Sequence, residues 1–102
     1  MQLQPGSVTI SPVSGSGPQV DTTSVTFGSP VSQVTAILTG FLVEFSGGND
    51  HHLGQLDVQV NIPQSGINGA TVTVDVTYGL RDWSGNWDDQ YDGTINFVVV
   101  GE

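Results

Sequence analysis

The side chains best able to do chemistry gather in one stretch of this chain, YGLRDWSGNWDDQYDG, residues 78–93. It contains both tryptophans, both tyrosines, the only arginine and four aspartates. Aromatic rings stack on the apolar face of a pyranose, and carboxylate, amide and guanidinium groups hold sugar hydroxyls through paired hydrogen bonds. The stretch therefore predicts a carbohydrate site, with contacts from Arg81, Trp83, Asn86, Trp87, Asp88, Asp89 and Tyr91.

Two other interpretations use the same residue types. Trp, Tyr and Arg are enriched at the centres of protein interfaces, so the stretch is also consistent with a contact between subunits. It can equally be a self-stabilising loop, because the Ser, Gly and Asn at residues 84–86 favour a turn. In that case Trp83 and Trp87 pack against each other across the turn, and Arg81 pairs with a neighbouring aspartate.

Calcium is a further alternative for this stretch. Asp82, Ser84, Asn86 and Asp88 stand at alternate positions, as the first ligands of an EF-hand loop do. The turn glycine falls at the fourth position of this pattern and not at the sixth, and no glutamate stands at the twelfth. We therefore expect no bound metal or cofactor. The weaker alternative is calcium bound in another geometry by Asp82, Asp88, Asp89 and Asp92.

A second polar stretch, NDHHLG at residues 49–54, supplies the next candidates. Adjacent side chains on an extended chain point to opposite faces, so His51 and His52 do not readily bind one metal ion. Two expected strands separate this loop from residues 79–93, and loops spaced in this way lie at the same end of a sandwich. We therefore add Asp50, His51 and His52 to the ligand-binding candidates.

No catalytic arrangement accompanies these residues. Paired aspartates can hydrolyse glycosides, but no second segment contributes the acids that would complete a cleft. The sequence also has no cysteine, nucleophile elbow or phosphate-binding loop. We expect no enzymatic activity.

Length and charge narrow the remaining possibilities. At 102 residues the chain is long enough for one domain. Ten acids against one arginine and no lysine give a net charge of −9, which excludes nucleic-acid binding and disfavours anionic membrane surfaces. No apolar run is long enough for membrane insertion. The segment MQLQPGSV has neither the basic flank nor the apolar core of a secretion signal.

Strands must position these candidates. Apolar and polar residues alternate strictly over 56–63 and 70–78, which predicts strands with one buried and one wet face. Residues 34–46 are apolar at both odd and even positions. This pattern predicts a strand that is buried on both faces, with a bend or bulge at Gly40. The fold predicted is an all-β, six-stranded antiparallel β-sandwich. Its expected strands are 7–13, 24–30, 34–46, 56–63, 70–78 and 94–100.

The chain divides into an N-terminal strand with a Gly/Ser/Pro-rich linker, residues 1–23, and a sandwich region, residues 24–102. Within the sandwich, the consecutive strands 34–46, 56–63 and 70–78 are expected to pair as neighbours, because sequential strands joined by loops usually do. The two segments together form one domain.

The order of these features resembles the H-type lectin domain of the snail agglutinins and of discoidin. The resemblance covers residues 27–100, and its segments are TFGSPVSQVTAILTGFLVEF, LGQLDVQV, INGATVTVDVTY and YDGTINFVVV. It implies a six-stranded antiparallel sandwich, assembled as a trimer or a pair of trimers, that binds sugar near subunit boundaries. It also implies that Tyr91 lines the sugar site and that Trp83 contacts the sugar. Two features depart from the family: Gln55 stands where a sugar-binding arginine is common, and the loop of residues 79–92 is longer and more acidic.

We therefore expect a non-enzymatic, carbohydrate-binding module that forms trimers or hexamers. The alternative is a structural, self-assembling surface or virion component, such as a phage tail-fibre head or decoration protein, with the aromatic and acidic loop at a subunit interface. A lysine-free, Thr- and Val-rich chain is suited to that role. Both interpretations favour an extracellular or virion-surface location.

Overall fold

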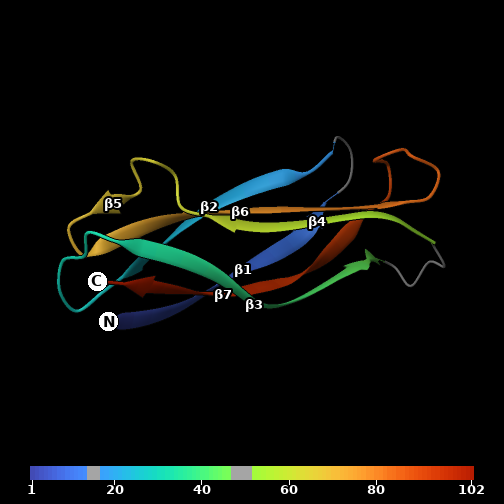
Figure 1. Ribbon diagram of the computed structural model, residues 1–102. Coiled ribbons are helices and arrows are strands. Elements are labelled where there is room, and N and C mark those ends of the chain that lie inside the picture. The colour runs from blue at the N-terminus through green and yellow to red at the C-terminus, as the bar shows by residue number, and fades with distance from the viewer. Residues whose placement is uncertain (14–16, 47–51) are drawn as a thin grey trace.

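The fold consists of two antiparallel β-sheets that share one hydrophobic core (Figure 1). The computed structural model describes residues 1–13, 17–46 and 52–102. One sheet has the strand order β1-β7-β3, and the other has the order β2-β6-β4, with β5 paired to β6. The strands are β1 (Gln2–Val13), β2 (Gln19–Thr26), β3 (Val34–Phe45), β4 (Leu53–Asn61), β5 (Ile67–Asn68), β6 (Thr71–Asp82) and β7 (Tyr91–Gly101).

The predicted all-β, antiparallel architecture is confirmed, but the described residues contain seven strands and not six. The additional strand is β5, which pairs with the start of β6 in a tight hairpin, Asn68 opposite Thr71. Gly69, at φ +62°, supplies the left-handed residue that the connection needs. None of the described residues lies in a helix long and apolar enough to cross a membrane.

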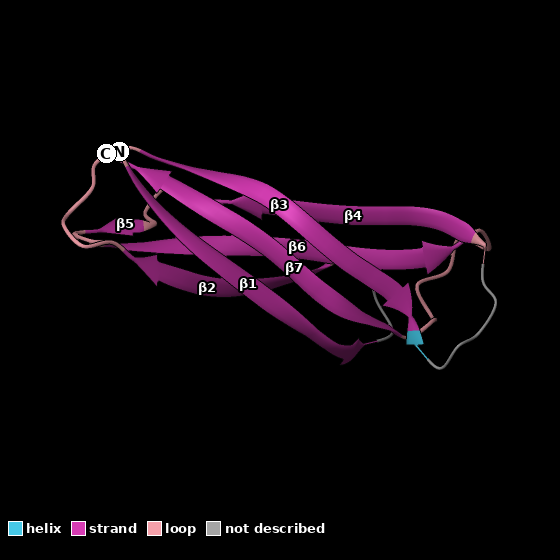
Figure 2. Cartoon of the chain, turned by 90° about the horizontal axis from the view of Figure 1, so that it is seen from below, coloured by secondary structure: helices cyan, strands magenta, loops and turns pink. Residues whose placement is uncertain are grey.

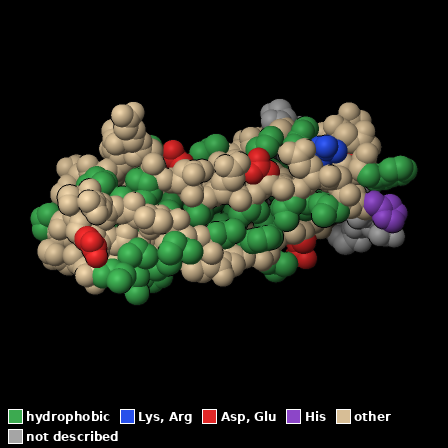
Figure 3. Space-filling view, viewed as in Figure 1, with side chains coloured by type: hydrophobic (Ala, Val, Ile, Leu, Met, Phe, Trp, Pro, Cys, Tyr) green, Lys and Arg blue, Asp and Glu red, His purple; other side chains and the backbone are tan. Residues whose placement is uncertain are grey.

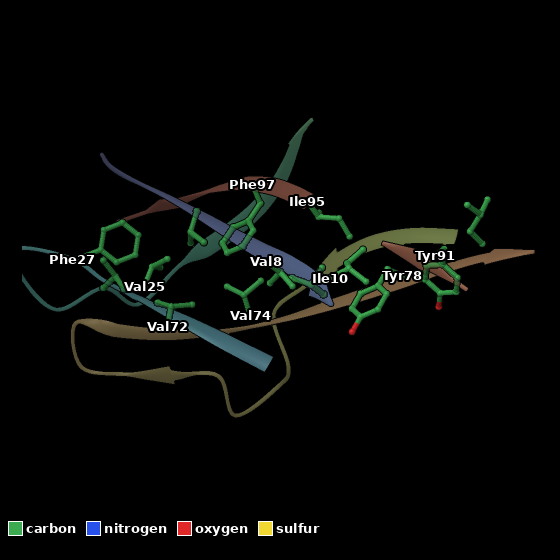
Figure 4. Packing of buried hydrophobic residues seen from close by; sticks show 14 residues of the cluster. Val8, Ile10, Val25, Phe27, Val72, Val74, Tyr78, Tyr91, Ile95 and Phe97 are labelled. Carbon is green, nitrogen blue, oxygen red and sulfur yellow. The ribbon is translucent and has the colours of Figure 1, made fainter. Parts of the chain in front are cut away.

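The central strands β6 and β7 provide most of the core. Val72, Val74 and Val76 of β6 are fully buried, and the Thr and Asp side chains between them face outward. Ile95 and Val99 of β7 are fully buried on the facing layer. Figure 4 shows the apolar side chains of the two sheets directed toward one another. The alternation in the sequence therefore identified the buried face correctly, because each central strand is covered on one side only.

The N-terminal strands are longer than predicted. β1 begins at Gln2, and β2 covers Gln19–Thr26, so residues 19–23 are strand and not linker. β2 pairs along its whole length with β6. The core-facing side of β2 includes Gln19, Asp21 and Thr23, opposite Tyr78, Val76 and Val74. An edge strand tolerates such polar residues, and the hydrophobic pattern therefore did not reveal it.

Strand β3 lies at an edge and not at the centre of a sheet. It pairs with β7, whereas β4 pairs with β6 in the other sheet, so the expected pairing of 34–46 with 56–63 is wrong. The pairing of 56–63 with 70–78 is confirmed. Burial of 34–46 on two sides is also wrong, because Ile37 is 46% exposed and Leu42 is 62% exposed. The predicted bulge is present: the register against β7 shifts between Leu38 and Gly40.

The chain passes from one sheet to the other four times, and three of the strands that precede these passages end at the same end of the molecule (Figure 2). These strands are β1, β3 and β6. The strand register brings their ends together, since Val13 and Phe45 both pair with Tyr91, and Leu53 pairs with Asp82. Residues 78–93 and the start of β4 therefore meet at one end, as the spacing of the loops predicts.

Candidate functional site

The loop of residues 83–90 joins the central strands of the two sheets and so spans one end of the pair of sheets. β6 reaches this end because it stays extended and paired with β4 as far as Asp82. In Figure 3 a histidine, the arginine and hydrophobic side chains come together at this end. The cluster seen in the sequence is therefore also a cluster in space, at a surface where several connections meet.

A tight turn follows β6. The side chain of Asp82 accepts a hydrogen bond from the Ser84 N–H at 3.0 Å and another from the Ser84 hydroxyl. The Asn86 N–H donates to Ser84 Oγ at 3.4 Å, and Gly85 has φ +87°. Asp and Ser stabilise turns in this way, and only glycine adopts such a φ readily. The predicted turn is confirmed, and Asp82, a candidate calcium ligand, caps it.

Trp83 projects from this turn into solvent, with 74% of its surface exposed. Its backbone N–H donates to the carbonyl of His52 at 3.0 Å, and its ring meets the imidazole edge-on with centroids 6.2 Å apart. The expected packing of Trp83 against Trp87 is wrong, because the Trp83 ring meets His52 and is otherwise directed into solvent. His52 is at the predicted place. Asp50 and His51 lie outside the described residues.

Arg81 is held on the neighbouring pair of strands. Its Nη2 group donates to Gln55 Oε1 at 3.2 Å, and Nη1 donates to the carbonyl of Asp82 at 3.1 Å. Gln55 and Arg81 are direct cross-strand partners in the β4–β6 pairing. The guanidinium therefore lies beside Gln55, the position at which the lectin resemblance expects an arginine. The sequence does not show this, because the partner of Gln55 depends on strand register.

Trp87 differs from Trp83 in being half-buried. The guanidinium carbon of Arg81 lies 5.8 Å from the centre of its ring, a cation–π distance. A Cβ at Gly79 would lie 3.0 Å from the Trp87 ring and 3.0 Å from Pro18, so the indole covers the bare backbone of β6 there. We conclude that Trp87 stabilises the loop and fixes Arg81.

Tyr91 does not face solvent, which corrects its expected stacking on a sugar. It is 3% exposed and belongs to the core, because it starts β7 on the core-facing parity. Its ring lies edge-on to Tyr78, with centroids 6.4 Å apart (Figure 4). Burial raises the pKa of Tyr91 above its ordinary value, and its hydroxyl has no hydrogen-bond partner within the described residues.

The second phenol, Tyr78, has a carboxylate partner that the sequence did not reveal. Its hydroxyl donates to Asp21 Oδ2 at 2.9 Å. Burial, followed by this hydrogen bond and the charge of Asp21, raises the pKa of Tyr78 to about 12. Both tyrosines are therefore structural groups behind the exposed site.

The remaining acids of the loop are spread out. Asn86 and Asp88 are exposed, and Asp89 is half-buried. Asp92 accepts a hydrogen bond from Ser46 Oγ at 2.6 Å. In residues 1–13, 17–46 and 52–102 no three His, Asp or Glu side chains are grouped closely enough to hold a metal ion. The candidate calcium ligands Asp82, Asp88, Asp89 and Asp92 thus do not form such a group.

A hollow of about 260 Å³ lies at the opposite end of the sandwich from this loop, beside the chain termini. Its lining residues are Met1, Gln33, Val34, Thr35, Val100 and Glu102.

Searches of protein-family models, curated proteins and solved structures give no match to this chain.

Proposed function

We propose that this chain is a non-enzymatic carbohydrate-binding module and that Trp83 is its stacking platform. The observation that carries the proposal is the indole of Trp83, 74% exposed at the end of the sandwich. Its backbone is anchored to His52, so the ring is presented by a hydrogen-bonded turn. A fixed, exposed indole offers a flat apolar surface of the kind that covers one face of a pyranose.

Polar groups next to this platform complete the requirements for holding hydroxyls. The described hydrogen bonds of Arg81 use two of its five N–H donors, so it retains donors for a ligand. Gln55 beside it offers an amide, and Asn86 and Asp88 are exposed on the same loop. Tyr91 has no part in this arrangement. The proposed contacts are Trp83, His52, Arg81, Gln55, Asn86 and Asp88.

A glycan array on the native protein tests this proposal, compared with Trp83→Ala and with Leu3→Ala as the matched control. Leu3 is also largely exposed, at 59%, but it lies on β1 near the opposite end. We expect Trp83→Ala to abolish the glycan signal and Leu3→Ala to preserve it. Repeating the array with a chelator separates calcium-dependent binding from direct binding.

Two results would count against the sugar site. The first is no glycan signal from the native protein, and the second is a signal that Trp83→Ala leaves unchanged. If Trp83→Ala instead lowers the oligomeric state and no glycan binds, Trp83 belongs to a subunit contact. That outcome would favour the structural, self-assembling alternative, because Trp is also among the residues enriched at interface centres.

A further inference from the structure

Most of edge strand β3 lacks the proline or charge that each of the other edge strands contains. Natural sheet edges avoid unwanted pairing through prolines or charged side chains. β1 contains Pro5 and Pro12, β2 contains Asp21, and β4 contains Asp57. Residues 34–43 of β3 contain neither a proline nor a charge. β7 pairs with one side of β3, and no strand of the described chain pairs with its other side.

The same strand exposes four large apolar side chains in a row around its bulge. Ile37 and Phe41 are each 46% exposed, Leu38 is 36% exposed and Leu42 is 62% exposed. Single exposed apolar residues are ordinary, but a contiguous group of this kind marks an interaction surface. These four side chains lie along the edge of β3 that no other described strand pairs with. Exposed apolar side chains and an unpaired strand edge therefore occur at the same place.

The two long sides of the sandwich differ. On the β1–β2 side the core-facing residues Val8, Ile10 and Val25 are at most 8% exposed. On the β3–β4 side the core-facing Phe41 and Leu56 are 46% and 37% exposed. Figure 3 shows hydrophobic side chains in a band along this side of the molecule. The core is therefore closed along one side and open along the side that contains β3.

The bulge makes the side-chain pattern of β3 symmetric about its middle. Leu38 and Phe41 lie opposite the buried residues Phe97 and Ile95, so both face the core side. Ile37 and Leu42 lie opposite Val98 and Thr94, so both face outward. In an ordinary strand, two residues at equal distances on either side of a peptide bond point to opposite faces of the sheet. The extra residue at Thr39 changes this in β3. Residues at equal distances on either side of the Thr39–Gly40 bond therefore point to the same face.

We propose that β3 is the interface of a two-fold homodimer, in which two copies of β3 pair antiparallel about the Thr39–Gly40 bond. This register places Leu38 opposite Phe41 of the second copy and Ile37 opposite its Leu42. All four exposed side chains then meet apolar partners on their own face. A two-fold contact requires a self-complementary patch, and the bulge provides one. The two three-stranded sheets become one continuous six-stranded sheet.

The length and the charge of this side both bear on the dimer. β3 has 12 residues and runs along the 46 Å dimension of the molecule, so it offers a long edge for pairing (Figure 2). Glu44, the charged residue of β3, falls opposite Thr35 of the second copy, so like charges do not meet directly. Each copy has a net charge of −9, and long-range repulsion therefore opposes assembly. The dimer should tighten between 10 and 150 mM salt, as the screening length falls from about 30 to about 8 Å.

Sedimentation velocity on the full chain tests the interface with Leu42→Lys and the control Val20→Lys. Val20 is 59% exposed on β2, and each substitution adds one positive charge, so overall repulsion falls equally in both variants. We expect a wild-type dimer, a dissociation constant at least tenfold higher for Leu42→Lys, and no weakening for Val20→Lys. Both sites are exposed, so circular dichroism should show intact folding in each.

The double variant Ile37→Glu/Leu42→Lys tests the register itself. The proposed dyad places each introduced carboxylate opposite the introduced ammonium of the other copy, so dimerisation should recover relative to Leu42→Lys alone. A monomeric wild type, or a wild-type oligomer unaffected by Leu42→Lys, would overturn the proposed interface. Failure of the double variant to recover would overturn the dyad. Leu42→Lys should still bind glycan, because Trp83 lies at the end of the two sheets and not on β3. Glycan binding by this variant therefore tests the sugar site separately from the dimer.

Discussion

The alkaline stability of this protein should depend on its two buried phenols. The sequence has no lysine and no cysteine, so Tyr78 and Tyr91 are the side chains whose ordinary pKa, near 10, lies in the alkaline range. Burial raises the pKa of both, and the hydrogen bond to Asp21 contributes further to that of Tyr78.

The sign and size of the effect follow from linkage. The folded state holds the Tyr78 proton more tightly than the unfolded chain, whose pKa is near 10.0, against about 12 in the fold. The stability from this group is therefore complete below pH 10 and is lost as the pH rises toward 12. Two pKa units correspond to about 3 kcal/mol of unfolding free energy.

Urea unfolding at intervals from pH 8 to pH 12 measures this loss. Tyr91→Phe leaves Tyr78 as the titrating phenol, and the unfolding free energy of this variant should fall by about 3 kcal/mol across the range. The double variant Tyr78→Phe/Tyr91→Phe should show no decline between pH 9 and 12. If the double variant declines as steeply as the wild type, or Tyr91→Phe shows no decline, the assignment to Tyr78 is refuted.

Three further substitutions test the core and the loop, each by urea or thermal unfolding at neutral pH. Val74→Ala should lower the unfolding free energy by about 2–3 kcal/mol, because it removes buried methyl groups from a fully covered position. Gly6→Ala should lower the melting temperature, since its Cβ would overlap the ring of Phe97, and a truncation at that ring (Phe97→Leu) should partly relieve the added cost. Trp87→Ala should destabilise the protein, because the Trp87 indole is half-buried. Trp83→Ala should change the unfolding free energy by less than about 0.5 kcal/mol, because the Trp83 indole is mostly exposed.

The parts of the fold that could be predicted are the strands buried on one face. In β6 every second residue is apolar, and the structure buries those residues against β7. Edge strands follow weaker rules, because solvent covers what the sheet does not. The hydrophobic pattern therefore did not predict residues 19–23 of β2 as strand, because their core-facing side is polar. The same pattern wrongly predicted that the apolar strand β3 is buried on both faces.

The candidate site was predicted in part. The turn at residues 84–86 and the meeting of His52 with the aromatic loop followed from local turn chemistry and from counting strands. The roles of the aromatic residues did not follow. Tyr91 points into the core and Trp83 into solvent, and that division depends on parity at the start of β7 and the end of β6.

By itself the sequence determined the strand-rich composition, the alternation of the central strands, the acidic surface and the concentration of aromatic residues between β6 and β7. These properties are local, since side-chain type and period-two spacing need no partner to be read. Only the tertiary structure decided which strands are neighbours. Strand register pairs Gln55 with Arg81, and the place of β3 at an edge leaves Phe41 and Leu42 open. Register and edge position are properties of two strands together, and contacts between segments distant in the chain establish them.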